Sequence, residues 1–277
     1  MKININKLLL FTANCLLLSV ISCTRVDLED PLKGKMTLVT DWSKRTTGIE
    51  QPENYIVKLG DQTLTYTQPS NLLPELGTGT YPIHIYNIPE KIAVSGTTAT
   101  VSTTGNTVDP LPGWLFTSIT EAVYADFKEE MITVQMQQQM RQLTITLAVK
   151  EGDPERISAT TAALTGVANS LDFKDNTHSG ANLSITPVFT RNGNQLTAIV
   201  RLLGTVAEPQ ILTLDITFSD GRIQHIESDV SSQLVNFNLD KHIPLTISGN
   251  LNTPIEAGMQ ATINGWTNTP NGSGTAW

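Results

Sequence analysis

Apolar and polar residues alternate along most of this chain with a period of two. In residues 143–149, Leu, Ile, Leu and Val alternate with Thr, Thr and Ala, and residues 212–218 repeat the pattern. Successive side chains of a strand point to opposite faces of its sheet, so each segment would present one apolar and one wetter face. The pattern therefore predicts strands in sheets that are buried on one side.

Further segments show the same tendency and are rich in threonine, whose β-branched side chain suits a half-buried pleated surface. These predicted strands are residues 36–42, 56–59, 62–67, 82–88, 99–102, 132–136, 157–164, 196–203, 235–239, 243–248 and 261–266. Two turns predict tight hairpins, because the dipeptides at 192–193 (Asn-Gly) and 220–221 (Asp-Gly) tolerate positive φ. Only residues 118–128 have weak helical spacing, from apolar residues at 119, 123 and 127, and we expect at most one or two turns there.

Closely spaced strands with almost no helix predict an all-β fold made of two tandem antiparallel β-sandwiches. We place the boundary near residues 129–141, because residues 132–141 lack Pro and Gly and run directly into the strand at Leu143, as an extended crossing would. The expected domains are an N-terminal β-sandwich over residues 35–138 and a C-terminal β-sandwich over residues 139–277. The last eleven residues, 267–277, are mostly Thr, Asn, Pro, Gly and Ser, and we expect this polar tail to fray.

The first 23 residues have the layout of a bacterial lipoprotein signal. Two lysines form a basic start, residues 8–21 are largely apolar, and Ser22 is the small residue before the cleaved bond. Residues 1–22 would then be the signal peptide, Cys23 the lipidated N-terminus, and residues 23–34 a tether. A transmembrane helix is the alternative, but two polar residues interrupt a run that is shorter than the roughly 20 apolar residues of a span.

Lipidation at Cys23 changes what the remaining composition means. The other cysteine, Cys15, lies within the signal, so we expect neither a disulfide nor a free thiol after processing. The chain has a net charge of −8 and lacks the clustered Lys and Arg residues that bind phosphates, so nucleic acid is not an expected partner. Membrane contact is expected through the lipid alone, because two or three acyl chains hold a protein at a membrane essentially permanently.

Residue patterns typical of catalysis, metal binding or cofactor binding are not found in the sequence. The four histidines are His84, His178, His225 and His242. None has a second ligand at the spacing of a zinc site, and no Gly-x-Ser-x-Gly elbow or calcium-loop spacing occurs. Glu129 and Glu130 are adjacent and would point to opposite faces of a strand, unlike the acid pair of a glycosidase. We therefore expect a structural or binding protein rather than an enzyme.

Six short landmarks follow Cys23 in a characteristic order. They are GKMTLVTDWS at 34–43, LGTGTY at 76–81, PGW at 112–114, MRQLTITLAV at 140–149, ALTG at 163–166 and INGW at 263–266. None is a catalytic motif, but their order and spacing resemble the fimbrillin-like lipoproteins of Bacteroidetes-type bacteria, especially the anchor or minor-subunit branch. The resemblance covers most of the chain after the signal.

This resemblance implies two transthyretin-like β-sandwich domains in a fimbrial subunit, or pilus subunit, exposed at the outer membrane. Its partners would be other fimbrial subunits, joined by donor-strand β-augmentation, and a host or bacterial surface ligand. In stalk subunits of the family a trypsin-like protease removes the first strand, and Arg45 lies where such a cut would fall. Arg45 equally suits an uncut basic turn, because cutting an anchor would separate its body from its lipid.

Two other functional classes remain open from the sequence. One is a surface lipoprotein that binds glycan or host ligand and does not polymerise, with Trp114, Tyr124 or Trp277 as a stacking face. Trp114 equally suits packing at the domain junction. The other is a sandwich-fold glycosidase or peptidase, which would need a converging acid pair or a metal site that the sequence does not show.

Overall fold

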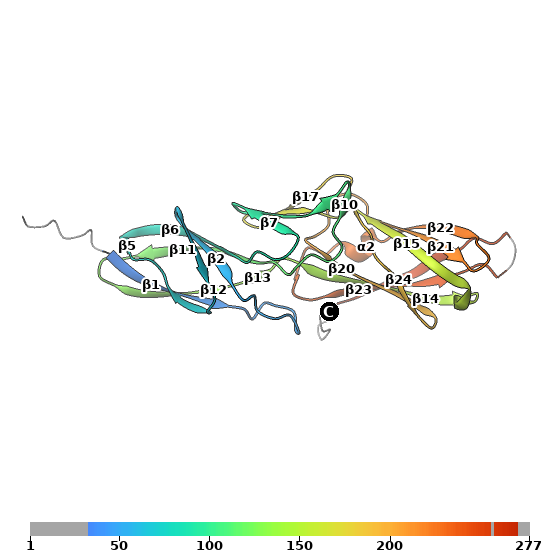
Figure 1. The fold of residues 1–277 in the computed structure, drawn as a ribbon, viewed down its shortest axis with the longest axis horizontal. Coiled ribbons are helices and arrows are strands. Elements are labelled where there is room, and N and C mark those ends of the chain that lie inside the picture. The colour runs from blue at the N-terminus through green and yellow to red at the C-terminus, as the bar shows by residue number, and fades with distance from the viewer. Residues whose placement is uncertain (1–32, 256–257, 271–277) are drawn as a thin grey trace, which may run out of the picture.

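The computed structural model describes residues 33–255 and 258–270. Nearly all of its regular structure is β-strand, which confirms the predicted all-β fold. Figure 1 shows an elongated molecule with strands from residues 33–86 and 116–135 at one end, those from residues 92–108 near the middle, and most strands of the second half at the other end. No helix in the described ranges has the length and apolar character needed to cross a membrane.

The first sandwich consists of two sheets that enclose a shared core of apolar side chains. One sheet contains, in order, β12 (Glu129–Gln135), β1 (Lys33–Asp41) and β4 (Ser70–Leu72), with β5 (Leu76–Gly77) also paired to β1. The other contains β13 (Gln137–Gln138), β11 (Phe116–Tyr124), β6 (Gly79–Tyr86), β2 (Tyr55–Leu59) and β3 (Gln62–Tyr66). Leu38 and Val134 of the first sheet meet Val57, Ile85 and Phe116 of the second in this core.

The second sandwich is larger, and β14, with its clear alternation, lies in the middle of one of its sheets. One sheet contains β19 (Thr190–Asn192), β20 (Gln195–Leu202), β14 (Arg141–Glu151), β23 (Leu245–Asn252) and β24 (Thr262–Pro270). The other contains β22 (Ile223–Asp229), β21 (Ile211–Phe218), β15 (Ile157–Thr165), β18 (Ser184–Ile185), β10 (Thr107–Val108) and β9 (Thr103–Thr104). Along β14 and β21 every second side chain is buried, as the period of two predicts.

Strands from residues 92–108 join the two halves of the chain. A further sheet contains β17 (Thr177–Ser179), β16 (Ser170–Asp172), β8 (Thr98–Val101) and β7 (Ile92–Ser95). Strand β8 pairs with β16, and β10 pairs with β18, so residues from before the expected boundary complete sheets of the second half. Their side chains, including Val101 and Val108, belong to the core of that half. The division at residues 138 and 139 stays a prediction, as does the transthyretin-like topology.

Most strand pairs are antiparallel, and both predicted tight hairpins are confirmed. Gly193 and Asn194 form the first turn, between β19, which ends at Asn192, and β20, and residues 219–222 connect β21 to β22. Among the described strands three pairs are parallel, namely β1 with β12, β14 with β23, and β10 with β18. Parallel strands need long connections, so local turn signals do not indicate these pairs.

Two predictions of local structure are wrong. Residues 118–128 are not helical, because β11 pairs with β6 along eight residues. The apolar residues Val123 and Phe127, which suggested a helix, are exposed at 60% and 75%. Residues 235–239 are not a strand but follow the short helix α2 (Ser231–Leu234) as turns. The only other described helix is a 3₁₀ turn, η2 (Pro154–Arg156).

The predicted polar tail is ordered further than expected. Residues 267–270 continue β24 and pair with β23, for example Thr269 with Thr246. Residues 271–277 lie outside the described ranges.

Candidate functional site

Strand β1 lies inside its sheet rather than at the edge. It pairs in parallel with β12 over seven residues, from Lys35 opposite Glu129 to Asp41 opposite Gln135. On its other side it pairs antiparallel with β4 and β5. Its Met36 and Leu38 side chains are buried in the first core. Removal of β1 would therefore open both the sheet and the core beneath it.

Strand β12 forms a free edge of that sheet, since β1 is the one described strand with which it pairs. Residues 131–135 are Met-Ile-Thr-Val-Gln and include no Lys, Pro or Gly, residues that commonly discourage pairing at natural edges. Met131 is 70% exposed beside this edge. The ion pair of Lys35 with Glu129, at 3.3 Å, is solvent-exposed and contributes little stability. The edge therefore presents backbone N–H and C=O groups that another strand could use.

The chain just after β1 is attached by hydrogen bonds to β13 and to the loop after α2. Thr46 is buried, and its backbone N–H donates to Gln138 Oε1 at 2.9 Å. Its hydroxyl donates to the carbonyl of His242 at 2.7 Å. Arg45 immediately precedes it and is half-buried. A protease that cuts after Arg45 would have to displace Thr46 from these contacts.

Gln138 and Arg141 hold the loop that follows α2. Gln138 Nε2 donates to the carbonyls of Met140 and Lys241, at 2.7 and 3.0 Å. The guanidinium of Arg141 is buried and donates to the carbonyls of residues 236, 237, 239 and 243, at 2.7–3.1 Å. Burial lowers the pKa of Arg141, although nearby Asp240 favours its charged form. In the predicted strand at residues 235–239, these backbone carbonyls would have accepted hydrogen bonds from a neighbouring strand. In the structure they accept them from the side chain of Arg141.

The whole described chain between residues 53 and 270 falls within one family match. The match is to the fimbrillin-A associated anchor proteins Mfa1 and Mfa2, over residues 53–271. The chain belongs to this family. The resemblance inferred from the sequence landmarks is thus confirmed.

Solved structures with the same fold include a fimbrial anchor and adhesin-type proteins. The anchor protein Mfa2 from Porphyromonas gingivalis is 13% identical, with a TM-score of 0.58 over 86% of this chain and 98% of that chain. A candidate adhesin from Bacteroides ovatus is 9% identical, with a TM-score of 0.62 over 85% and 95% of the two chains. Candidate polysaccharide-binding proteins from Bacteroides thetaiotaomicron are 8% identical, with a TM-score of 0.60 over 86% and 98%. These likenesses are of fold, and no curated protein sequence matches the chain.

Residue Cys23, the expected lipid attachment point of this anchor-family protein, lies outside the described residues. Its lipidation stays a prediction, as does the signal peptide of residues 1–22. The tether predicted for residues 23–34 also stays a prediction up to residue 32, whereas Lys33 and Gly34 already belong to β1 and pair with β5. Cleavage after Arg45 also stays a prediction, for which the structure supplies the local geometry.

Of the aromatic residues that the alternative glycan-binding class would use as a stacking face, Tyr124 and Trp114 pack inside the protein. Tyr124 ends β11 and is 1% exposed, and burial raises its pKa to about 12. Its hydroxyl donates to the carbonyl of Pro74 at 3.1 Å. Trp114 is partly buried, packs against the cores of both halves and lies 4.5 Å below the guanidinium of Arg201. Trp114 is therefore a junction residue, and Trp277 lies outside the described residues.

The histidines occupy separate environments. His84 lies on β6, His225 contacts Asp215 at 2.7 Å on the surface, and His178 contacts Lys241. Within residues 33–255 and 258–270, no group of three His, Cys, Asp or Glu residues could hold a metal ion.

Sequence reasoning missed the polar residues at the junction. The burial of Arg141 could have been predicted from the sequence. It lies two and four residues before the buried Leu143 and Ile145, and alternate residues of a strand face the same side, so Arg141 points into the core from β14. Gln138 and Lys241 had no such signal, since their neighbours come from distant segments of the chain.

Proposed function

We propose that this member of the anchor family is a non-enzymatic surface lipoprotein that joins a fimbrium to the outer membrane. Lipid on Cys23 would hold the protein, and a strand of the neighbouring fimbrial subunit would add to β12. The observation that carries this proposal is the free edge of β12 beside exposed Met131. In β-augmentation, backbone hydrogen bonds along such an edge supply affinity, and alternate side chains supply specificity.

The hydrogen bonds of Thr46 support an anchor rather than a stalk role, because they hinder a cut after Arg45. The Arg45–Thr46 bond precedes a buried residue with two hydrogen bonds to distant parts of the chain. Cutting there would leave β1, and the lipid N-terminal to it, attached by noncovalent contacts alone. An uncut chain keeps the lipid covalently joined to both sandwiches.

A pair of proline variants tests the β12 edge. Successive N–H groups of an edge strand point alternately toward its neighbour and toward solvent, and proline is tolerated where the N–H faces solvent. Of Ile132→Pro and Thr133→Pro, one should therefore keep the melting temperature of the unmodified chain and the other should lower it. The stable variant should lose attached fimbriae, counted per cell by immunogold microscopy.

Full attachment of fimbriae by the stable proline variant would overturn strand addition at β12. The alternative of a lipoprotein that binds glycan and does not polymerise predicts that outcome, together with no change in fimbriae in the absence of the protein. The likeness to candidate polysaccharide-binding proteins is one of fold and motivates this alternative without deciding for it.

A further inference from the structure

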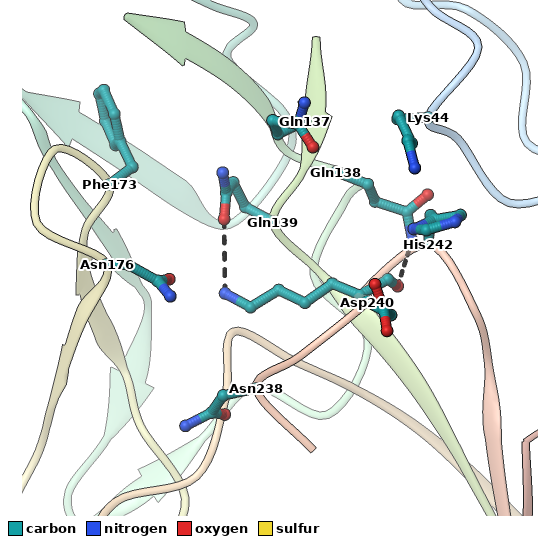
Figure 2. A pocket seen from close by; sticks show the side chains of 10 residues that line it. Lys44, Gln137, Gln138, Gln139, Phe173, Asn176, Asn238, Asp240 and His242 are labelled. Atoms are coloured by element: carbon teal, nitrogen blue, oxygen red, sulfur yellow. Dashed lines mark hydrogen bonds between the residues drawn. The ribbon is translucent and has the colours of Figure 1, made fainter. Parts of the chain in front are cut away.

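A cavity of about 310 Å³ lies where the two halves of the chain meet. Its walls come from β13 and the residue after it, from the β16–β17 turn, from the loop after α2, and from Lys44. Figure 2 shows side chains from these separate segments around one space. The volume is at the lower end of the roughly 300–1,000 Å³ of ligand pockets, so it suits one compact ligand.

The amine of Lys241 lies at the inner wall of this cavity. Lys241 is 7% exposed, and its Nζ lies 2.9 Å from His178 Nε2 and 3.4 Å from Gln139 Oε1, the latter contact drawn as a dashed line in Figure 2. No carboxylate of the described residues forms a salt bridge with it. A buried cation without an anionic partner is costly, and an anionic ligand would remove that cost.

The composition of the wall narrows the class of ligand. Five of its ten residues are Asn or Gln. Gln138 is buried, and both groups of the Asn238 amide bond to the backbone of Thr205, which leaves Gln137, Gln139 and Asn176, all labelled in Figure 2, for contact with a ligand. Amide groups both donate and accept hydrogen bonds, as sugar hydroxyls require. The wall has no guanidinium for bidentate phosphate binding, and Asp240 would repel a doubly charged anion. Lys44 and Asp240 are both exposed and carry opposite charges, which leaves the buried amine of Lys241 and several amides to match one carboxylate and several hydroxyls.

We propose that this cavity binds a sugar acid, with its carboxylate on the amine of Lys241 and its hydroxyls on the side-chain amides of Gln137, Gln139 and Asn176. The site is local to the junction and does not depend on strand addition at β12. Failure of this inference would therefore leave the proposed anchoring role untouched.

Calorimetric titration of the chain without residues 1–22, with Cys23→Ser, tests the site. The probes are glucuronate and N-acetylneuraminate, with glucose as the neutral sugar and acetate as the simple carboxylate. We expect the two sugar acids to bind at least about tenfold more tightly than either control, because a hydrogen bond to a charged group adds to those of the hydroxyls. Methyl glycosides of both acids distinguish a glycan terminus, which they mimic, from a free sugar acid.

Two variants locate the binding energy. Lys241→Met should weaken sugar-acid binding at least about tenfold, with Lys150→Met at an exposed position as its control. Asn176→Asp places a negative charge at the cavity and should also abolish binding. Asn182→Asp is its matched control, because Asn182 is likewise exposed, has φ of 55° against 53° for Asn176, and is not a wall residue.

The pH dependence of the affinity for sugar acids distinguishes a lysine that binds the ligand from one that only stabilises the fold. Burial lowers the pKa of Lys241 to about 7, so binding should be about tenfold tighter at pH 6 than at pH 8. Burial and the nearby Lys241 lower the pKa of His178 to about 4, so His178 stays neutral across this range. Burial, with Lys44, also lowers the pKa of His242. Asp240 and Lys44 face the cavity too, and comparison with Lys241→Met removes the contribution of all three.

Equal binding of glucose or acetate, or unchanged binding by Lys241→Met, would overturn the proposal. So would an Asn176→Asp variant that binds as well as Asn182→Asp. If Lys241→Met does not fold, the two Asn variants and the pH dependence of the unmodified chain decide the question.

Discussion

Replacing Gln138 by Ala should expose the Arg45–Thr46 bond to trypsin while both sandwiches stay folded. In the unmodified chain, Gln138 Oε1 accepts the buried backbone N–H of Thr46 at 2.9 Å. In the variant that N–H lacks its acceptor while the loop is closed, and it is hydrated when the loop opens. A buried donor without a partner costs about 1–3 kcal/mol, so the free energy of opening should fall by about 2 kcal/mol.

A fall of that size raises the population of the open loop about 30-fold. Cleavage follows this population when the loop opens and closes faster than trypsin cuts. We therefore expect cleavage after Arg45 to accelerate about 30-fold, measured by mass spectrometry during digestion under native conditions. Lys174, which is exposed in the β16–β17 turn, serves as an internal reference whose cleavage rate should not change.

Gln137→Ala is the matched control, because Gln137 is the exposed neighbour in β13 and donates to Gln135 Oε1 at the surface. Melting temperatures are recorded in parallel, since Gln138 also donates to two buried carbonyls whose loss lowers global stability. The reasoning is refuted if the unmodified chain is cut after Arg45 as fast as after Lys174. Equal cleavage rates for Gln138→Ala and Gln137→Ala would refute it too.

Three further changes have defined outcomes. Cys23→Ala should release the subunit into the medium with an unchanged melting temperature, and retention in the membrane fraction would contradict lipid anchoring. Arg141→Met should lower the free energy of unfolding in urea by at least about 3 kcal/mol, because several carbonyls lose their donor. Arg222→Met, which removes an exposed ion pair, should change the free energy of unfolding little. Equal losses of unfolding free energy in Arg141→Met and Arg222→Met would contradict this prediction. Because burial lowers the pKa of Lys241 to about 7, the unfolded chain binds more protons between about pH 7 and 10. Stability of the unmodified chain should therefore rise over that interval, and Lys241→Met should remove the rise.

The sequence predicted those elements whose burial depends on local alternation. Strands β14 and β21 expose one face to the core and one to a wetter surface, so their apolar residues recur with the period of the strand. Strand β11 hid this signal, because Val123 is exposed while Ala122 and Tyr124 are buried. Its pairing with β6, rather than its own pattern, determines its conformation.

Partners distant in the chain could not be predicted in the same way. Alternation indicates which face of a strand is buried but not which strand lies beside it, so the parallel pair of β1 with β12 gave no signal. The cavity could not be predicted for the same reason, because its wall combines segments distant in the chain, namely Lys44, β13, the β16–β17 turn and Lys241. Only the fold brings these residues together, and none belongs to a motif of fixed spacing.

The parallel pairing of β1 with β12 also bears on how an anchor would carry load. If Cys23 is lipidated, tension from the membrane enters β1 at its Lys33 end, and tension from an added strand enters β12 along its length. Under a pull along the strands, the seven residue pairs between them would be sheared together rather than broken one by one. A cut after Arg45 would leave this pairing as the main link between lipid and body. In a lipid-anchored subunit, the hydrogen bonds of Thr46 would therefore protect the covalent path from lipid to body, a path that a subunit losing its first strand does not need.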